Sequence, residues 1–347
     1  MKRITIRDVA KEAGVSVTTV SFVMSNKKCE EAGLDKKYCI VEETADRVLQ
    51  AVNKLGYRPN LAASSLRNGR RNTIGVITSD IANHFFSDIA RSIENVAYDS
   101  GYTVLFASSD ESESKMESIV DTFLDNSLDG MIIAPCKGGG AVVRKVIDAG
   151  IPTVLFDRDL PGLSCGRVLL DNVKAGEMAV DLLYDAGYRK IAMINYSLGI
   201  SSMDDREKGY REAMRRHSLS GEIDVCTTVY GQAEQDIRDY IIDCVRRKVD
   251  AILFPTNTIS VIGLEVLHDL NIEVPDVMAV VCFDKNDCYD LYSPRITRIT
   301  QSTEDMAVES FNMLRKIIER PDEKYDHTVV LQPEVILRES TSTKKTI

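Results

Sequence analysis

No uninterrupted apolar segment of the 347-residue sequence is long enough to cross a lipid bilayer. The opening residues, MKRITIRDVAKEAG, contain no apolar stretch of the kind that a secretory signal needs. These absences argue against an integral membrane protein and against an exported one. We therefore expect a protein that stays in the cytoplasm and has no membrane partner.

The eight cysteines form no CxxC pair and no cluster with the four histidines, so neither a zinc site nor a disulfide framework is indicated. Catalytic and phosphate-binding patterns are missing as well. The stretch KGGGA at 137–141 lacks the GxGxxG and GxxxxGK[ST] spacings, and the S-x-x-K at 112–115 has no accompanying motif. We expect no metal, no cofactor and no enzymatic activity.

The chain as a whole has a negative net charge, but one part of it has a positive one. The net charge of −10 divides into +6 for residues 1–72, with 14 Lys and Arg against 8 Asp and Glu, and −16 for the remainder, with 29 against 45. Such a split favours a small head that meets a polyanion and a large body that does not, although chance clustering gives the same count. The length predicts two or three packed units.

The first residues of the head carry the signals of two short helices. In TIRDVAKEAGVS, Thr5 and Asp8 form a capping-box pattern, Gly14 ends the helix, and Ser16 is a good N-cap for the next one. In VSVTTVSFVMSN the buried stripe leaves Phe22 on the opposite face. This arrangement predicts a helix-turn-helix, whose second helix enters the DNA major groove. The side chains expected to face the groove are Val17, Thr18, Ser21 and Phe22.

A third amphipathic helix is expected in EETADRVLQAVNKLGY, followed by the segment RPNLAASSLRNGRRN. Asn60 can cap a helix of about six residues there, which is too short to be stable alone and could form on docking. Leu66 could then act as an apolar wedge in the minor groove. The expected phosphate contacts around it are Arg58, Arg67, Arg70 and Arg71.

From residue 73 onward, short β-rich runs alternate with amphipathic helices such as 84–100 and 114–126. The runs TIGVITSD, YTVLFASSD, GMIIAPC, IPTVLFD and RVLLD are interpreted as buried parallel strands, and the pattern repeats in KIAMIN, VCTTVY, AILFPTN and VMAVVCFD. We predict two doubly wound α/β subdomains with a ligand cleft at the carboxyl ends of the strands.

Polar and aromatic residues suited to a sugar follow several of these strands. Arginine and carboxylate groups chelate adjacent hydroxyls, and aromatic rings cover the apolar faces of a sugar ring. We expect Arg206 and Asp284 to grip hydroxyls from opposite sides, although any one of these residues could instead be structural. The expected effector-binding residues are Asn83, Phe85, Phe86, Asp157, Arg158, Arg206, Asn257, Asp284 and Gln301.

The segments TIRDVAKEAGVSVTTVSFVMS and LGYRPNLAASSLR, with the body that follows, resemble the LacI family of bacterial transcription regulators over essentially the whole chain. The resemblance implies a helix-turn-helix head joined to a body like the periplasmic sugar-binding proteins. It implies a homodimer on a pseudo-palindromic, double-stranded operator, controlled by a small molecule. It assigns base reading to Val17, Thr18 and Phe22 and minor-groove contacts to Ala63 and Leu66, and it supports the nine effector positions. The expected DNA-binding set is Thr5, Ser16, Val17, Thr18, Ser21, Phe22, Arg58, Asn60, Ala63 and Leu66.

The sequence departs from the family at two places in the head. Many relatives have Arg where this chain has Phe22, so a bidentate guanine contact is not available there. The insertion at 27–41 is longer than the usual connection, and Val41 stands where a Ser or Thr would cap the third helix. We expect the insertion to cap that helix or to pack on it. Cys29 and Cys39 could form a redox switch, but a reducing cytosol argues against one.

We therefore predict a repressor of carbohydrate genes with a headpiece at 1–58, a hinge at 59–72, an effector and dimerisation domain at 73–340 and a tail at 341–347. The nine effector positions together favour a monosaccharide-like ligand, although Thr258, after Asn257, replaces the Asp that relatives often have, which leaves open the pattern of hydroxyls recognised. Arg158 and Arg206 could also hold the phosphate of a sugar phosphate or a nucleoside derivative. A stand-alone sugar-binding protein would not need residues 1–72.

Overall fold

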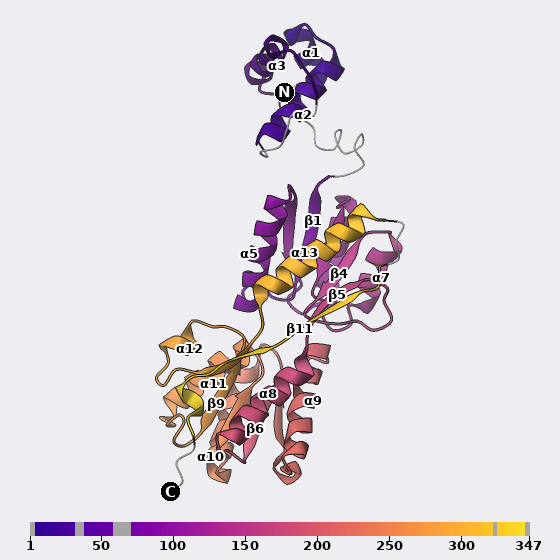
Figure 1. The fold of residues 1–347 in the computed structure, drawn as a ribbon. Coiled ribbons are helices and arrows are strands. Elements are labelled where there is room, and N and C mark those ends of the chain that lie inside the picture. Colours follow the sequence, from indigo (N-terminus) through magenta and orange to yellow (C-terminus); the bar gives the residue numbers. More distant parts are fainter. Residues whose placement is uncertain (1–3, 32–37, 58–70, 322–324, 344–347) are drawn as a thin grey trace. The chain divides into compact units, whose positions relative to one another are not determined.

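The computed structural model describes residues 4–31, 38–57, 71–321 and 325–343. The chain separates into two compact units, Met1–Asn72 and Thr73–Ile347, which are considered one at a time (Figure 1). The expectations for Arg58, Asn60, Ala63 and Leu66, and for Arg67 and Arg70, lie outside the described residues.

The head contains three helices, α1 (Ile6–Ala13), α2 (Val17–Glu31) and α3 (Glu42–Leu55). The predicted capping box is confirmed, because the Thr5 amide donates to Oδ2 of Asp8 over 2.8 Å. Gly14, at φ 64°, ends α1, and Oγ of Ser16 accepts the amide of Thr19 over 3.0 Å to begin α2. The helices enclose a small aliphatic core of Val9, Val20, Val23, Val48 and Val52.

The second helix continues into the insertion and ends at Glu31. Ile40 of the insertion packs on the head core, to which all three helices contribute. Val41 is the N-cap of α3 and has no capping side chain; its backbone carbonyl accepts the amides of Thr44 and Ala45. Among the described residues no side chain of the insertion caps this helix.

The body holds two six-stranded sheets, each covered by helices on both faces. The first sheet has the order β11-β5-β4-β3-β1-β2 and is parallel throughout. The second has the order β12-β10-β9-β8-β6-β7, with only β12 antiparallel. The strands of the first sheet are β1 (Thr73–Thr78), β2 (Thr103–Ser108), β3 (Gly130–Ile133), β4 (Thr153–Phe156), β5 (Gly166–Leu170) and β11 (Thr328–Leu331). Those of the second are β6 (Ile191–Tyr196), β7 (Asp224–Thr228), β8 (Ala251–Phe254), β9 (Ala279–Phe283), β10 (Thr297–Thr300) and β12 (Glu334–Ile336).

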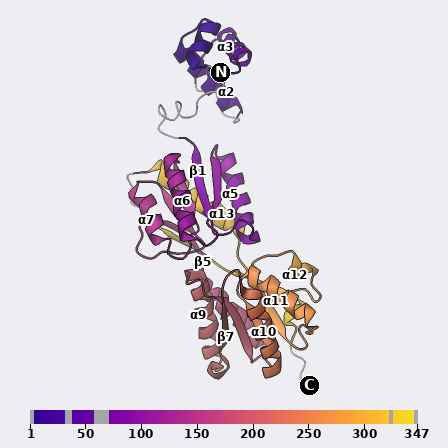
Figure 2. The same cartoon turned by 180° about the vertical axis from the view of Figure 1, so that it is seen from behind.

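Helices α5 and α13 pack on one face of the first sheet, and α6 and α7 pack on the other (Figures 1 and 2). In the second sheet, α8 and α9 cover one face and α10 and α11 the other. These helices are α5 (His84–Asp99), α6 (Glu113–Asp125), α7 (Gly140–Asp148), α8 (Asn172–Asp185), α9 (Ser201–Arg216), α10 (Ala233–Arg247), α11 (Asn257–Asp269) and α13 (Thr303–Glu319); α12 (Cys288–Leu291) is a single turn. Two-sided cover explains why the central strands are continuous apolar runs.

The strand pattern of the sequence identified the inner strands other than β10 and overestimated burial at the sheet edges. YTVLFASSD forms β2, but Leu105 and Phe106 are more than a third exposed, because β2 is an edge strand. VCTTVY likewise forms an edge strand, β7, which is only partly buried. Strands β10, β11 and β12 were not predicted at all. They are short: β10 (TRIT) and β12 (EVI) each contain a charged residue, and β11 (TVVL) is a partly buried edge strand, so none has the long apolar run that marks a buried strand.

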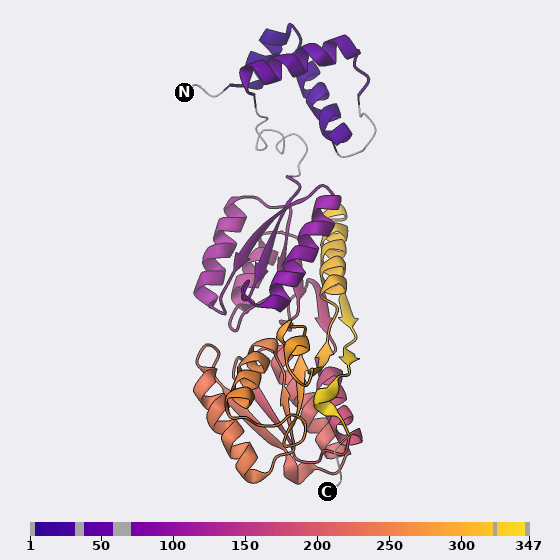
Figure 3. The same cartoon turned by 90° about the vertical axis from the view of Figure 1, so that its left-hand side faces the viewer.

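The chain passes between the two subdomains three times, after β5, after β10 and after β11 (Figure 3). Each sheet is therefore built from segments far apart in sequence. At the interface of the two subdomains, the loops that follow the parallel strands of both sheets face a common cleft.

Candidate functional site

The cleft between the subdomains brings together all nine residues that the sequence suggested for an effector. Asn83, Phe85, Phe86, Asp157 and Arg158 come from the first subdomain, and Arg206, Asn257, Asp284 and Gln301 come from the second or from the crossing that leaves it. Arg206 and Asp284 share one wall, so the opposing wall is made by the two phenylalanines and by Asp157 and Arg158.

The aromatic part of the cleft lies at the start of α5. Asn83 is the N-cap of that helix and accepts the amide of Phe85 over 3.0 Å. Phe85 and Phe86 are buried, with ring centroids 5.0 Å apart in an edge-to-face arrangement. Phe86 also packs on Phe156 of the core, so these rings are fixed by the sheet beneath them.

Two carboxylates stand directly after central strands in strained backbone. Asp157 follows β4 at φ 65° and Asp284 follows β9 at φ 61°. Non-glycine residues in this left-handed region are uncommon and gather at functional sites. Burial raises the pKa of the Asp157 carboxyl, and the positive charges of Arg158 and Arg206 oppose that rise. Both carboxylates are therefore held in place before any ligand arrives.

Arg158 is committed to a carboxylate of its own subdomain. Its Nη1 and Nη2 donate to Glu111 over 2.9 and 2.6 Å, and Nη1 also reaches the carbonyl of Pro135. Its Nε lies 3.3 Å from Oδ2 of Asp157 without forming a hydrogen bond. The guanidinium is thus largely neutralised by protein groups.

Arg206 is held equally firmly in the second subdomain. Its Nε donates to Oδ1 of Asn172 over 2.8 Å and its Nη1 to the carbonyl of Pro255 over 2.6 Å. The guanidinium lies 4.5 Å from the ring centroid of Phe283. Close packing of α8 and α9 makes this possible, because a methyl group at Gly176 would collide with the carbonyl of Arg206.

The side chain of Gln301 offers a ligand a hydrogen-bond acceptor. Its Nε2 donates to Oδ1 of Asp284 over 2.8 Å, which orients the amide. Its Oε1 is buried and has no hydrogen-bond partner among the described residues. A buried acceptor without a partner is costly, so this oxygen is suited to a donor on a ligand.

Three hydrogen bonds join the two walls of the cleft. The hydroxyl of Tyr230 donates to Asp80 over 2.8 Å, the amide of Asn257 donates to Asn83 over 2.7 Å, and the amide of Asn83 donates to the hydroxyl of Thr258 over 3.5 Å. Beside the cleft, Oγ of Ser201 accepts the amide of Asp159 from the other subdomain over 2.9 Å. The enclosed volume is only about 50 Å³. Ligand pockets usually measure about 300–1,000 Å³, so the walls must separate to admit a ring-sized ligand.

In the head, the expected base-reading residues do not all share one environment. Thr5, Ser16, Val17 and Thr18 are exposed, and Ser21 and Phe22 are half-buried. Phe22 stacks on Tyr38 from the insertion, with ring centroids 4.0 Å apart and an interplanar angle of 11°. The ring of Phe22 therefore contacts the ring of Tyr38 within the head, whereas Val17 and Thr18 on the preceding turn of α2 are exposed.

Comparison with known proteins matches residues 5–60 to the family model for bacterial regulatory proteins of the lacI family and residues 180–341 to a periplasmic binding protein-like domain. The transcriptional regulator RegA of Clostridium saccharobutylicum is 30% identical, covering 97% of this chain and 98% of its own. The chain belongs to the LacI family. It is a DNA-binding transcriptional regulator and not an enzyme.

Other relatives agree with this family assignment. The ribose operon repressor of Halalkalibacterium halodurans is 28% identical over 97% of each chain. A crystal structure of the lac repressor dimer bound to operator and the anti-inducer ONPF shares the fold, with a TM-score of 0.82 and 20% identity over 98% of this chain and 100% of that one. The expected fold of a helix-turn-helix head and a body of two parallel-sheet subdomains is confirmed.

Several cleft residues of this LacI-family chain were missed by the sequence reasoning. Asp80, Glu111 and Tyr230 follow β1, β2 and β7, so the same rule about strand ends would have found them. The Leu198–Met203 side of the cleft, which follows β6, gives no comparable signal, because most of its side chains are apolar. His84 is exposed and does not line the cleft.

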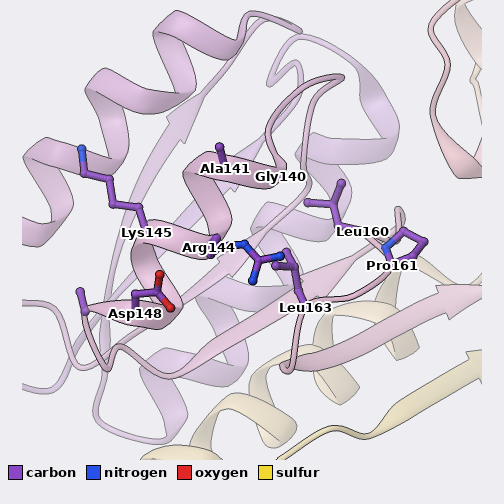
Figure 4. A pocket seen from close by; sticks show the side chains of 9 residues that line it. Gly140, Ala141, Arg144, Lys145, Asp148, Leu160, Pro161 and Leu163 are labelled. Atoms are coloured by element: carbon purple, nitrogen blue, oxygen red, sulfur yellow. The ribbon is translucent and has the colours of Figure 1, made fainter.

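A larger depression, of about 750 Å³, lies beside α7 and contains none of the expected residues (Figure 4). Gly140 begins that helix, so the glycine-rich stretch at 137–141 is a helix start. Lys145 at its rim is paired with Asp121. Across the described ranges, no group of three His, Cys, Asp or Glu could hold a metal ion, and no helix is long and apolar enough to span a membrane.

Proposed function

We propose that this LacI-family regulator is a homodimeric repressor of carbohydrate genes whose operator affinity is controlled by a neutral, hydroxyl-rich molecule in the cleft, with a monosaccharide as the best candidate. The observation that carries the proposal is the unsatisfied Oε1 of Gln301, a residue that lines the cleft together with Phe85, Phe86 and Asp284. A sugar hydroxyl can donate to that oxygen, and its neighbours can chelate adjacent hydroxyls.

The charge of the cleft argues against an anionic ligand. Four carboxylates line it (Asp80, Glu111, Asp157 and Asp284) against two guanidinium groups (Arg158 and Arg206), which leaves a formal charge of −2. Both arginines already bond to protein oxygens. A phosphate would approach an excess of carboxylates, with part of the donor capacity of both arginines already used, so a sugar phosphate is disfavoured relative to a neutral sugar.

The head supports sequence-specific binding to a pseudo-palindromic operator. Val17 and Thr18 are exposed at the start of α2, where a helix-turn-helix contacts base edges. We infer that Thr5, Ser16 and Ser21 contact the DNA beside them. Action on chromosomal DNA would place the protein in the cytoplasm.

Dimerisation is assigned to the first subdomain. Tyr98 on α5 is 79% exposed, and Leu105 and Phe106 on the adjacent edge strand are 37% and 38% exposed. Leu105 and Phe106 point to opposite faces of the sheet, as successive strand residues do, so apolar atoms are exposed on both sides of this edge. Exposed apolar surface marks interaction sites. A second copy pairing through this surface would supply the second head that a two-fold operator requires.

Control by the ligand would act through opening and closing of the cleft. Hydrogen bonds between the subdomains form only when the cleft is closed. Among them are the bonds from Tyr230 to Asp80, from Asn257 to Asn83 and from the Asp159 amide to Ser201. A ligand changes DNA affinity only as far as it binds the open and closed bodies differently, and the operator must change ligand affinity by the same factor.

A thermal-shift screen of the full chain against monosaccharides, sugar phosphates and nucleosides tests the ligand class. A ligand at 100 times its dissociation constant stabilises the folded protein by about 2.7 kcal/mol. We expect stabilisation by one or a few neutral monosaccharides. Stabilisation by sugar phosphates or nucleosides alone would contradict the proposed ligand class.

Titrating the identified sugar with and without operator DNA tests control. We expect different dissociation constants in the two titrations. Equal constants would rule out ligand control of DNA binding, because linkage requires the two equilibria to affect each other.

A further inference from the structure

The insertion places a second aromatic ring on the face of α2 that carries Thr18 and Phe22. Tyr38 stacks on Phe22 with a centroid separation of 4.0 Å and nearly parallel planes. Thr18 and Phe22 are four residues apart on one helix and therefore share a face. Tyr38 comes from the other side of the insertion, so only tertiary structure brings it to this face.

The backbone of Tyr38 is fixed independently of its ring. Asn26 on α2 is only 8% exposed, and its amide makes two bonds to that backbone. Its Nδ2 donates to the Tyr38 carbonyl over 2.6 Å, and its Oδ1 accepts the Tyr38 amide over 2.8 Å. Two residues further along, Ile40 packs on the head core. The segment is therefore attached at three points.

We propose that Tyr38 is a specificity-determining residue and that Phe22 and Tyr38 contact the operator as one stacked aromatic unit. The inference rests on the proposed role of this face of α2 in base reading. Two stacked rings offer a wider apolar surface than Phe22 alone, without the paired donors that recognise guanine. Such a surface favours the methyl group of thymine, so the unit should read a base pair that contains thymine.

The competing arrangement is a cover that lifts from Phe22 when DNA binds. Lifting would break both hydrogen bonds of the Asn26 amide and leave a buried polar group without partners, which is unfavourable. The stack and the Ile40 contact would be lost as well. Keeping the segment in place retains all of these contacts, so the observations favour a reading role over a cover.

The test uses the full chain and a duplex selected by the wild-type protein from a randomised DNA library, with a scrambled duplex of equal length as the reference. Affinities are measured for wild type, Phe22→Ala, Tyr38→Ala and the double variant. We expect Tyr38→Ala to weaken binding to the selected duplex by about 5- to 50-fold and binding to the scrambled duplex by less than about twofold. The double variant should lose less than the product of the two single losses, because neighbouring residues couple.

A repeated selection with Tyr38→Ala adds a readout that a purely structural role would not change. We expect it to relax the preference at the same base pair that Phe22→Ala relaxes, with the other positions retained. Tyr38→Phe, which keeps the ring, should bind the selected duplex nearly as well as wild type. Thermal unfolding of each variant, with Tyr38→Leu as a second apolar replacement, identifies any variant whose head no longer folds.

The outcomes separate the inference from the function on which it rests. Tighter binding by Tyr38→Ala would show a cover, and equal losses on both duplexes or an unchanged affinity would show a structural contact; each overturns the inference. If Phe22→Ala relaxes the base-pair preference and Tyr38→Ala does not, the proposed reading face of α2 remains supported and only the role of Tyr38 is overturned. A wild-type protein that does not discriminate the two duplexes would overturn the proposed function itself.

Discussion

Ser201→Ala should weaken ligand binding without removing any group that lines the cleft. Oγ of Ser201 at the start of α9 accepts the backbone amide of Asp159 from the other subdomain over 2.9 Å. Ser201 and Asp159 are half-buried, and neither lines the cleft. The substitution therefore acts on closure and leaves the ligand contacts in place.

The size of the effect follows from the single bond that is lost. A neutral intramolecular hydrogen bond contributes about 0.5–1.5 kcal/mol net, so about 1 kcal/mol is expected here. Each 1.4 kcal/mol is a factor of ten, which makes the closed form about fivefold less favourable relative to the open one. We expect the free body to be mainly open and the liganded body to be closed, so this factor enters the ligand affinity.

Isothermal titration of wild type and Ser201→Ala with the monosaccharide found in the screen measures the effect. We expect the dissociation constant to rise about three- to fivefold. Ser342→Ala is the matched control, because its hydroxyl donates only to the nearby carbonyl of Glu339 within the second subdomain. An unchanged or tighter affinity for Ser201→Ala would refute the reasoning that this bond stabilises the liganded body.

Other predictions follow from the same contacts. Deletion of residues 1–72 should abolish operator binding in a mobility-shift assay and keep sugar binding, since the body has its own cores; a body that still shifts operator DNA would contradict the assignment. Asp284→Ala and Arg206→Ala should each cost roughly 2–5 kcal/mol of ligand-binding free energy, measured by calorimetry, with little change in operator affinity in the absence of ligand. Arg206→Ala should also lower the melting temperature, because Asn172 and the Pro255 carbonyl lose their hydrogen-bond donor. Phe106→Glu on β2 should convert the dimer to a monomer in sedimentation at micromolar concentration, whereas Val330→Glu on the opposite edge strand should not; dimers in both would move the interface elsewhere. With iodoacetamide at neutral pH, Cys39 should be alkylated well before Cys165 and Cys244, because Cys39 is exposed while burial raises the pKa of Cys165 to about 11 and that of Cys244 to about 12; peptide mass spectrometry showing equal rates would contradict this.

The redox hypothesis for the insertion remains a prediction. Cys39 is an exposed free thiol, and the side chain of Cys29 lies outside the described residues. The thiol labelling described above reports on Cys39 directly.

Local signals were sufficient for the head helices and for the central strands. The Thr5 capping box, the Gly14 stop and the Ser16 cap act within three or four residues, so they are legible without any tertiary information. Central strands covered on both faces must be apolar along their whole length, and their carboxyl ends must meet at one edge of the sheet. This rule, together with the family resemblance, led from the sequence to nine of the residues that line the cleft.

Only the tertiary structure decided which of these side chains remain available to a ligand or to DNA. The sequence shows that Arg158 and Arg206 carry positive charge, whereas the structure shows that Glu111, Asn172 and the Pro255 carbonyl already bond to them. Asn83 meets Asn257 across 174 residues of sequence. Such contacts depend on where three chain crossings bring the two sheets, and no local pattern encodes that position.

The same limit applies to α2, the second helix of the head. Periodicity alone shows that Phe22 points away from the core, because a helix repeats every 3.6 residues whatever surrounds it. Periodicity is silent on what covers the exposed face. The Tyr38 ring reaches Phe22 because a buried Asn26 captures the backbone of an insertion that has no regular pattern of its own. The direction of a side chain is set by local geometry, whereas its partner is set by the packing of distant segments.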